Sequence, residues 1–132
     1  MVELQVDLLE TLPQILGDRV ALQQVFLNVI TNAVEAMAVV LDRPRVLSVT
    51  TELGGSHCLL IKLQDSGEGI GPDEMLRIFD AFFSTKSNGM GMGLAICRSI
   101  VEAHGGRLWA SSMVPNGSTF HIALPSRHAE EP

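Results

Sequence analysis

The chain has 132 residues, of which 46% are hydrophobic and 18% are charged, and its formal net charge is −6. This composition is typical of one globular domain and excludes an intrinsically disordered chain. The negative net charge argues against a surface that binds nucleic acids or anionic membranes. No apolar run is long enough to span a bilayer, and the first residues lack a signal-peptide pattern. We therefore expect a cytoplasmic domain.

Alternation of apolar and polar residues predicts five strands, at 2–8, 46–52, 57–63, 107–112 and 118–124. A 3.6-residue period predicts a long helix that begins after Asp18, a good N-cap, and ends near Asp42. A short helical piece is expected at 72–79, and a second long helix opens at Gly93 and ends at 105–106. This order predicts a two-layer α/β sandwich, with helices covering one face of a mixed, mostly antiparallel sheet.

Three reactive side chains are expected to be structural. Cys58 and Cys97 lie in a predicted strand and a predicted helix and lack metal-ligand spacing, so both are expected to be reduced and buried. His104, beside the glycines that end the second helix, is expected to be a cap residue rather than a catalyst.

The stretch 65–71 (Asp-Ser-Gly-Glu-Gly-Ile-Gly) directly follows a predicted strand and has the character of a binding site. The Asp65 carboxylate offers only hydrogen-bond acceptors, so it could bind an exposed amino group such as that of adenine. Gly67, Gly69 and Gly71 would let the backbone approach a flat ligand closely. The alternative is an ordinary turn that ends the strand, because Asp, Ser and Gly all favour turns.

Two further patterns suggest a polar pocket. Asn28, Asn32 and Glu35 lie on one edge of the first helix's buried face. Asparagine is a poor helix former, so its presence there suggests that its amide has a hydrogen-bond partner. They could instead bond to neighbouring loops. Gly89, Gly91 and Gly93 precede the second helix and would free backbone N–H groups to hold phosphate, although the loop is neither a P-loop nor a dinucleotide motif.

Five motifs in this order resemble the ATP-binding catalytic domain of bacterial sensor histidine kinases, within the GHKL superfamily of gyrase, heat-shock chaperone and MutL ATPases. They are the N box at 28–33, the first glycine box at 65–69, the F box at 78–83, the second glycine box at 89–94 and the last box at 117–120. The stretches 82–86 and 100–106 are most similar to the FixL and NtrB type. The resemblance implies a Bergerat-type sandwich at 1–125, with about five strands covered on one face by about three helices, and a frayed tail at 126–132.

The resemblance also implies an ATP site. Its residues would be Asn28, Asn32, Asp65, Gly67, Gly69, Ile70, Lys86, Gly89, Gly91, Gly93, Leu94 and Ser118. Asp65 would accept a hydrogen bond from the adenine amino group, with Ser118 and water completing the polar contacts. Asn32 would bind Mg²⁺ through its side-chain oxygen, while Asn28 would stand beside the phosphates.

Two positions depart from the patterns of relatives. Many histidine kinases have a lysine where this chain has Glu35, so Lys86 is the candidate for the missing cation, unless it is only a solvated lysine. ATP-hydrolysing relatives have a glutamate base where this chain has Asn28, which cannot take a proton from water. This substitution favours phosphoryl transfer to a partner over hydrolysis, with Asn28, Asn32 and Lys86 as the catalytic candidates.

No stretch before Asp18 is long enough for the helical hairpin that carries a sensor kinase's phosphoacceptor histidine. We therefore expect an excised catalytic domain whose partner is a separate dimerisation domain of the same kinase, with a response regulator downstream. The parent kinase could be soluble or anchored in a membrane. Alternative hypotheses are an ATPase of the gyrase, MutL or chaperone type, a serine-directed kinase related to anti-sigma factors, and a binding module without nucleotide.

Overall fold

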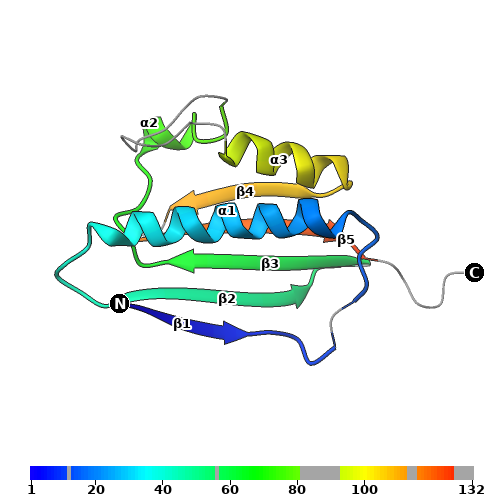
Figure 1. Cartoon of the computed structure of the whole chain (residues 1–132), viewed down its shortest axis with the longest axis horizontal. Coiled ribbons are helices and arrows are strands. Elements are labelled where there is room, and N and C mark those ends of the chain that lie inside the picture. The colour runs from blue at the N-terminus through cyan, green and yellow to red at the C-terminus, as the bar shows by residue number, and fades with distance from the viewer. Residues whose placement is uncertain (12, 56, 81–92, 113–115, 127–132) are drawn as a thin grey trace, which may run out of the picture.

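The structure is a computed structural model, and it describes residues 1–11, 13–55, 57–80, 93–112 and 116–126 (Figure 1). The elements are β1 (Val2–Asp7), α1 (Arg19–Ala38), β2 (Arg45–Leu53), β3 (Cys58–Asp65), α2 (Pro72–Met75), α3 (Gly93–Ala103), β4 (Arg107–Ser112) and β5 (Ser118–Pro125). All five predicted strands and both long helices are therefore present, but the first helix ends at Ala38 rather than near Asp42. The short helix expected at 72–79 covers only Pro72–Met75.

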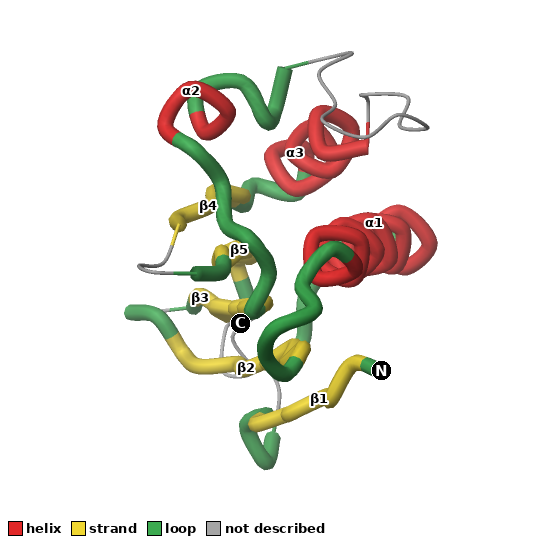
Figure 2. Tube along the Cα trace, turned by 90° about the vertical axis from the view of Figure 1, so that its left-hand side faces the viewer, coloured by secondary structure: helices red, strands yellow, loops and turns green. Residues whose placement is uncertain are grey.

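The five strands form one sheet in the order β1-β2-β3-β5-β4. β1 pairs with β2 in parallel, and the other three pairs are antiparallel. Helices α1 and α3 lie beside each other across one face of the sheet, and the four-residue α2 lies toward the β4 edge (Figure 2). The predicted two-layer sandwich with a mixed, mostly antiparallel sheet is confirmed.

Helix α1 is the longest element and lies over the centre of the sheet. Its N-cap is confirmed, because the Asp18 side chain accepts a hydrogen bond from the Ala21 N–H at 3.1 Å. The residues of its buried face are Val25, Val29, Ala33 and Met37. Beyond the last turn, Arg45 donates to the carbonyl oxygens of Ala38 (3.0 Å) and Val40 (2.9 Å), and so satisfies groups that a helix end leaves without partners.

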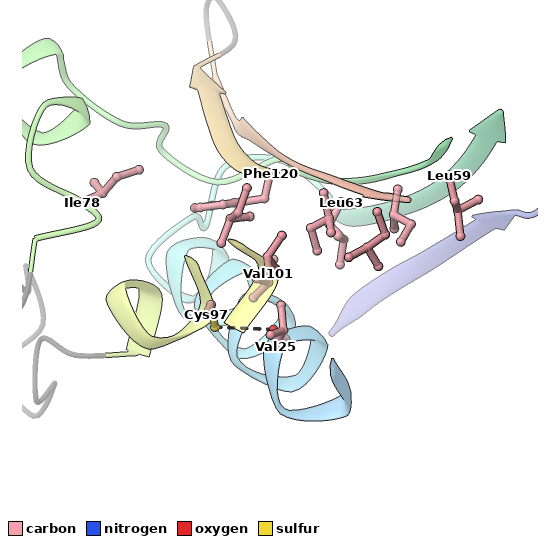
Figure 3. Close-up of a cluster of buried hydrophobic side chains, with 12 residues drawn as sticks. Val25, Leu59, Leu63, Ile78, Cys97, Val101 and Phe120 are labelled. Atoms are coloured by element: carbon pink, nitrogen blue, oxygen red, sulfur yellow. Dashed lines mark hydrogen bonds between the residues drawn. The ribbon is translucent and has the colours of Figure 1, made fainter. Parts of the chain in front are cut away.

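The core lies between the sheet and the two long helices (Figure 3). Ser118, Phe120, Ile122 and Leu124 alternate along β5, share its inner face and are all buried. Ile78 is buried in the same cluster, and the Phe79 ring meets the Phe120 ring edge-on at 6.4 Å. These contacts anchor the start of the predicted F box to the core.

The structural roles expected for Cys97 and His104 are also observed, whereas Cys58 is less buried than expected. Cys58 and Cys97 are unpaired thiols; Cys97 is fully buried between α1 and α3 and Cys58 is half-buried. Burial raises the pKa of the Cys97 thiol, and a hydrogen bond from Asn28 offsets part of that rise. The His104 ring lies 2.7 Å from the Ile100 carbonyl through Nδ1 and accepts from the Asp18 N–H through Nε2 at 2.9 Å, so the end of α3 is bonded to the start of α1.

The opposite face of the sheet carries a ring stack. The Trp109 and His121 rings are parallel, with centroids 4.9 Å apart, and the Arg107 guanidinium lies 4.8 Å from the Trp109 ring centre. Lys62 is the β3 neighbour of His121 in the strand register. Burial, and then the positive charge of Lys62, lower the pKa of His121, so the neutral imidazole is the form that the fold favours.

Candidate functional site

The buried carboxylate of Asp65 is the centre of the candidate site. It ends β3, and the register places it directly opposite Ser118, the first residue of β5. The Ser118 hydroxyl donates to Oδ2 at 2.8 Å and the Gly67 N–H donates to Oδ1 at 2.8 Å, while both Asp65 and Ser118 are only 3% exposed. Because each carboxylate oxygen has more than one lone pair, Asp65 can still accept a hydrogen bond from a ligand's amino group.

The glycine loop after Asp65 packs directly against the rest of the protein. A β-carbon on Gly67 would lie 2.9 Å from the Ala36 carbonyl oxygen of α1, a distance that real β-carbons do not show. Gly69 has φ +87° and lies against Gly117 at the start of β5, and the Ile70 N–H donates to the Ser112 hydroxyl at 3.2 Å. The loop therefore needs glycine for its own packing as well as for any ligand.

Gly117 closes the site from the β5 side. Its φ is +97°, and a β-carbon there would collide with the main-chain oxygen of Asp65. The last box of the predicted motif set therefore begins at a position where side chains are excluded, one residue before the hydroxyl that bonds the carboxylate.

Residues between the end of α1 and the start of β2 support the glycine loop, and sequence reasoning missed them. Arg43 Nη2 donates to the carbonyl oxygens of Gly67 (2.8 Å) and Ser66 (3.3 Å). The Ser66 hydroxyl accepts from the Val46 N–H at 2.8 Å and donates to the Pro44 carbonyl at 3.1 Å. In the sequence, an arginine between an aspartate and a proline indicates only a turn, so no local signal identifies this role.

The second group of candidates lies where α1 passes the start of α3. The Asn28 amide oxygen accepts from Gln24 at 2.9 Å, and the Asn28 amide nitrogen is 4.0 Å from where a β-carbon would stand on Gly93. The Asn28 amide nitrogen, which also donates to the Cys97 thiol, therefore lies beside the first turn of α3. Asn32 lies one turn further along α1 and is half-buried, and Glu35 is exposed.

The remaining candidates divide into described and undescribed residues. Ile70 and Leu94 are partly buried and pack against the main core cluster. Lys86, Gly89 and Gly91 lie outside the described residues, as do the last two phenylalanines of the predicted F box. Their expected roles stay predictions.

The described residues provide neither a metal cluster nor a membrane span. Within the described ranges, no group of three or more His, Cys, Asp or Glu side chains could hold a metal ion, and none of the helices combines the length and apolarity that a bilayer span needs. A cavity of about 430 Å³ lies between the first half of α1 and strands β2 and β3, lined by apolar side chains that include Leu22, Phe26 and Ile61. This lining does not suit a phosphate.

Comparison with known proteins identifies the family. The family described as histidine kinase-, DNA gyrase B- and HSP90-like ATPase (HATPase_c) matches residues 17–128. The chain belongs to this family. This HATPase_c domain is 45% identical over 112 residues to the sensor protein FixL of Bradyrhizobium diazoefficiens, an alignment that covers 85% of the chain and 22% of FixL. The chain spans between 12% and 24% of the length of the first curated relatives that it matches.

Solved structures agree with this assignment. The mycobacterial sensor histidine kinase MprB matches with a TM-score of 0.82 and 30% identity, over 96% of this chain and 84% of MprB. Full-length ShkA, solved in complex with AMPPNP, matches with a TM-score of 0.81 and 29% identity, over 99% of this chain and 27% of ShkA. The predicted resemblance to the catalytic domain of sensor histidine kinases is confirmed, and the alternative functions within this family are not favoured.

Proposed function

We propose that this HATPase_c domain binds ATP with Mg²⁺ and donates the γ-phosphoryl group to a histidine on a separate dimerisation domain, as one step of two-component signalling. The observation that carries the proposal is the buried Asp65 carboxylate, held from both sides at the end of β3 beside a glycine loop. The similarity to sensor histidine kinases along most of the chain supports the same function.

Asp65 would select the base. Its carboxylate cannot donate a hydrogen bond, so it suits the amino group of adenine and disfavours the carbonyl group that guanine has at the equivalent position. Ser118 and the Gly67 N–H hold both carboxylate oxygens in fixed directions, so little reorganisation is needed on binding. Because Gly67 and Gly69 lack side chains, the loop backbone would also be available to a flat ligand.

Asn28, Asn32 and the start of α3 would face the phosphates. The Asn28 amide nitrogen lies beside the first turn of α3, and the first N–H groups of that 11-residue helix have no partners within the helix. Asn32 offers an amide oxygen, a donor type that Mg²⁺ accepts, and a cation bound mainly by phosphate and water needs few protein ligands. When bound, Mg²⁺ would neutralise charge on the phosphate oxygens. Lys86, Gly89 and Gly91 would complete this end, as the sequence predicts.

The reaction would be transfer rather than hydrolysis. Asn28 occupies the position where ATP-hydrolysing relatives have a glutamate, and an amide that accepts from Gln24 cannot take a proton from water. A nitrogen of the partner's histidine would form the new bond to the γ-phosphorus as the bond to the bridging oxygen of the departing ADP breaks. The domain's contribution is then to position the nucleotide and to stabilise its charge. A response regulator would receive the phosphoryl group afterwards.

Calorimetric titration of the domain with ATP and GTP, with and without Mg²⁺, tests the proposal, together with a phosphate-release assay on the same sample. We expect selective binding of ATP and almost no release, and then transfer of labelled phosphate when the kinase's own histidine-bearing hairpin is added. Rapid release without the hairpin would instead identify an ATPase. A domain that fails to bind ATP both alone and with the hairpin would refute the proposal.

A further inference from the structure

We infer that Arg43 is a positioning residue for base recognition: it orients the peptide unit whose N–H holds the Asp65 carboxylate in place. This inference rests on the proposed binding of adenine at Asp65. Arg43 follows α1 in the loop that leads to β2, and the glycine loop begins 23 residues later in the chain at Ser66. Only the folded sheet brings the two segments together.

Peptide geometry couples the Arg43 contact to the Asp65 carboxylate. The carbonyl of Ser66 and the N–H of Gly67 belong to one planar unit and point in opposite directions. Arg43 Nη2 donates to the Ser66 carbonyl at 3.3 Å, and the Gly67 N–H at the other end of that unit donates to Asp65 Oδ1 at 2.8 Å. A rotation of this peptide would therefore break both bonds together, and Asp65 would lose one of its two donors.

A second contact fixes the next peptide unit. Arg43 Nη2 also donates to the Gly67 carbonyl at 2.8 Å, so the guanidinium contacts two successive carbonyl groups of the loop. Glycine leaves the backbone free to rotate, and a glycine-rich loop needs such external bonds to keep a single conformation. The positive charge also strengthens both bonds, because charged donors form stronger hydrogen bonds than neutral donors.

The burial of Arg43 indicates that this position is not an ordinary surface turn. Its side chain is only 26% exposed, although it also contacts the exposed Asp42 at 3.1 Å. Its Nε atom is buried and, within the described part of the chain, has no hydrogen-bond partner. Leaving a buried donor unpaired is costly, so the guanidinium is placed where it serves the loop carbonyls rather than where all its own donors are satisfied.

Arg45 provides a matched control two residues away. Its guanidinium also donates to two main-chain carbonyls, but these belong to Ala38 and Val40 at the end of α1. Loss of Arg45 should therefore destabilise the same region without touching the glycine loop. Any effect that Arg43 variants share with Arg45 variants is structural, and an effect confined to Arg43 variants comes from the loop.

The test compares ATP with purine riboside triphosphate, which lacks only the amino group that Asp65 would recognise. Dissociation constants for both are measured with Mg²⁺ on the wild-type chain and on Arg43→Met, Arg43→Lys and Arg45→Met. We expect Arg43→Met to weaken ATP about fivefold to tenfold, the size of effect typical for the net contribution of one ordinary hydrogen bond, and to leave the analogue nearly unchanged. Arg43→Lys keeps one charged donor and should restore part of the discrimination, and Arg45→Met should keep all of it.

The outcomes separate this inference from the function on which it rests. Wild-type protein that binds neither nucleotide, or binds both equally, refutes adenine recognition at Asp65 and this inference with it. If folded Arg43→Met prefers ATP over the analogue as strongly as the wild type does, the inference is overturned while adenine recognition stands. The same holds if Arg45→Met loses as much of this preference as Arg43→Met. If Arg43→Met does not fold, Arg43→Lys decides: unchanged discrimination together with unchanged hydrogen exchange at the Gly67 N–H overturns the inference.

Discussion

Replacing Asp65 with asparagine should exchange the base preference of the domain rather than abolish binding. The substitution keeps the shape of the side chain, and its remaining oxygen can still accept from the Gly67 N–H. The new NH₂ group then replaces Oδ2, beside a Ser118 hydroxyl that can rotate to accept from it. The adenine amino group would meet a donor in place of a charged acceptor. The loss of one charge-assisted hydrogen bond, about 1.5–3 kcal/mol, corresponds to a roughly 10- to 150-fold rise in the Kd for ATP.

The same change should improve binding of inosine triphosphate, because its ring carbonyl can accept from the new amide. The assay is calorimetric titration of wild type and Asp65→Asn with both nucleotides at fixed Mg²⁺, after circular dichroism has shown that the variant is folded. Glu68→Gln removes one negative charge from the exposed part of the same loop and serves as the control. An Asp65→Asn protein that is folded and binds ATP as tightly as the wild type would refute the assignment of adenine to Asp65.

Three further predictions concern the fold. Gly117→Ala should lower the free energy of unfolding by about 3 kcal/mol or more, because the new β-carbon collides with a main-chain atom and the backbone there is strained. Gly55→Ala, at φ +61° in open space, should lower it by only about 1–2 kcal/mol. Urea titration of both variants checks the difference. Because the fold lowers the pKa of His121, the unfolded state binds its proton first as the pH falls below about 6.5. The free energy of unfolding should therefore decline as the pH falls through that value. A His121→Gln variant whose free energy of unfolding depends on pH as steeply as that of the wild type would contradict this. A thiol reagent should modify the half-buried Cys58 of the native protein, but Cys97 only on unfolding, because burial both covers that thiol and raises its pKa; rapid native labelling of both would contradict the burial.

Much of the site could be predicted because its signals are local. An aspartate at the end of an apolar strand, followed by alternating glycines, indicates a tight loop beside a carboxylate wherever it occurs. The alternation of side chains along a strand predicts which residues of 118–124 share one face, and Ser118 belongs to the inner set. The N-cap at Asp18 and the cap role of His104 also depend on neighbouring residues only.

The contacts that the sequence did not reveal join distant segments. Arg43 reaches a carbonyl 24 residues away, Ser112 accepts from an N–H 42 residues away, and the second bond of His104 reaches Asp18, 86 residues away. None of these pairs leaves a periodic pattern or a spacing rule in the chain. They depend on the order in which strands enter the sheet, which composition and periodicity do not specify.

The pairing of Asp65 with Ser118 also has a consequence for how the domain folds. The two residues are 53 positions apart, yet they occupy the same rung between β3 and β5. A slip of one residue in this pairing would turn the Ser118 hydroxyl to the other face of the sheet. The base-recognising pair therefore cannot form within any early local unit, and it requires the closure of a long loop, which is a slow class of folding event. A nascent chain should accordingly acquire nucleotide affinity only once β5 has left the ribosome and inserted between β3 and β4.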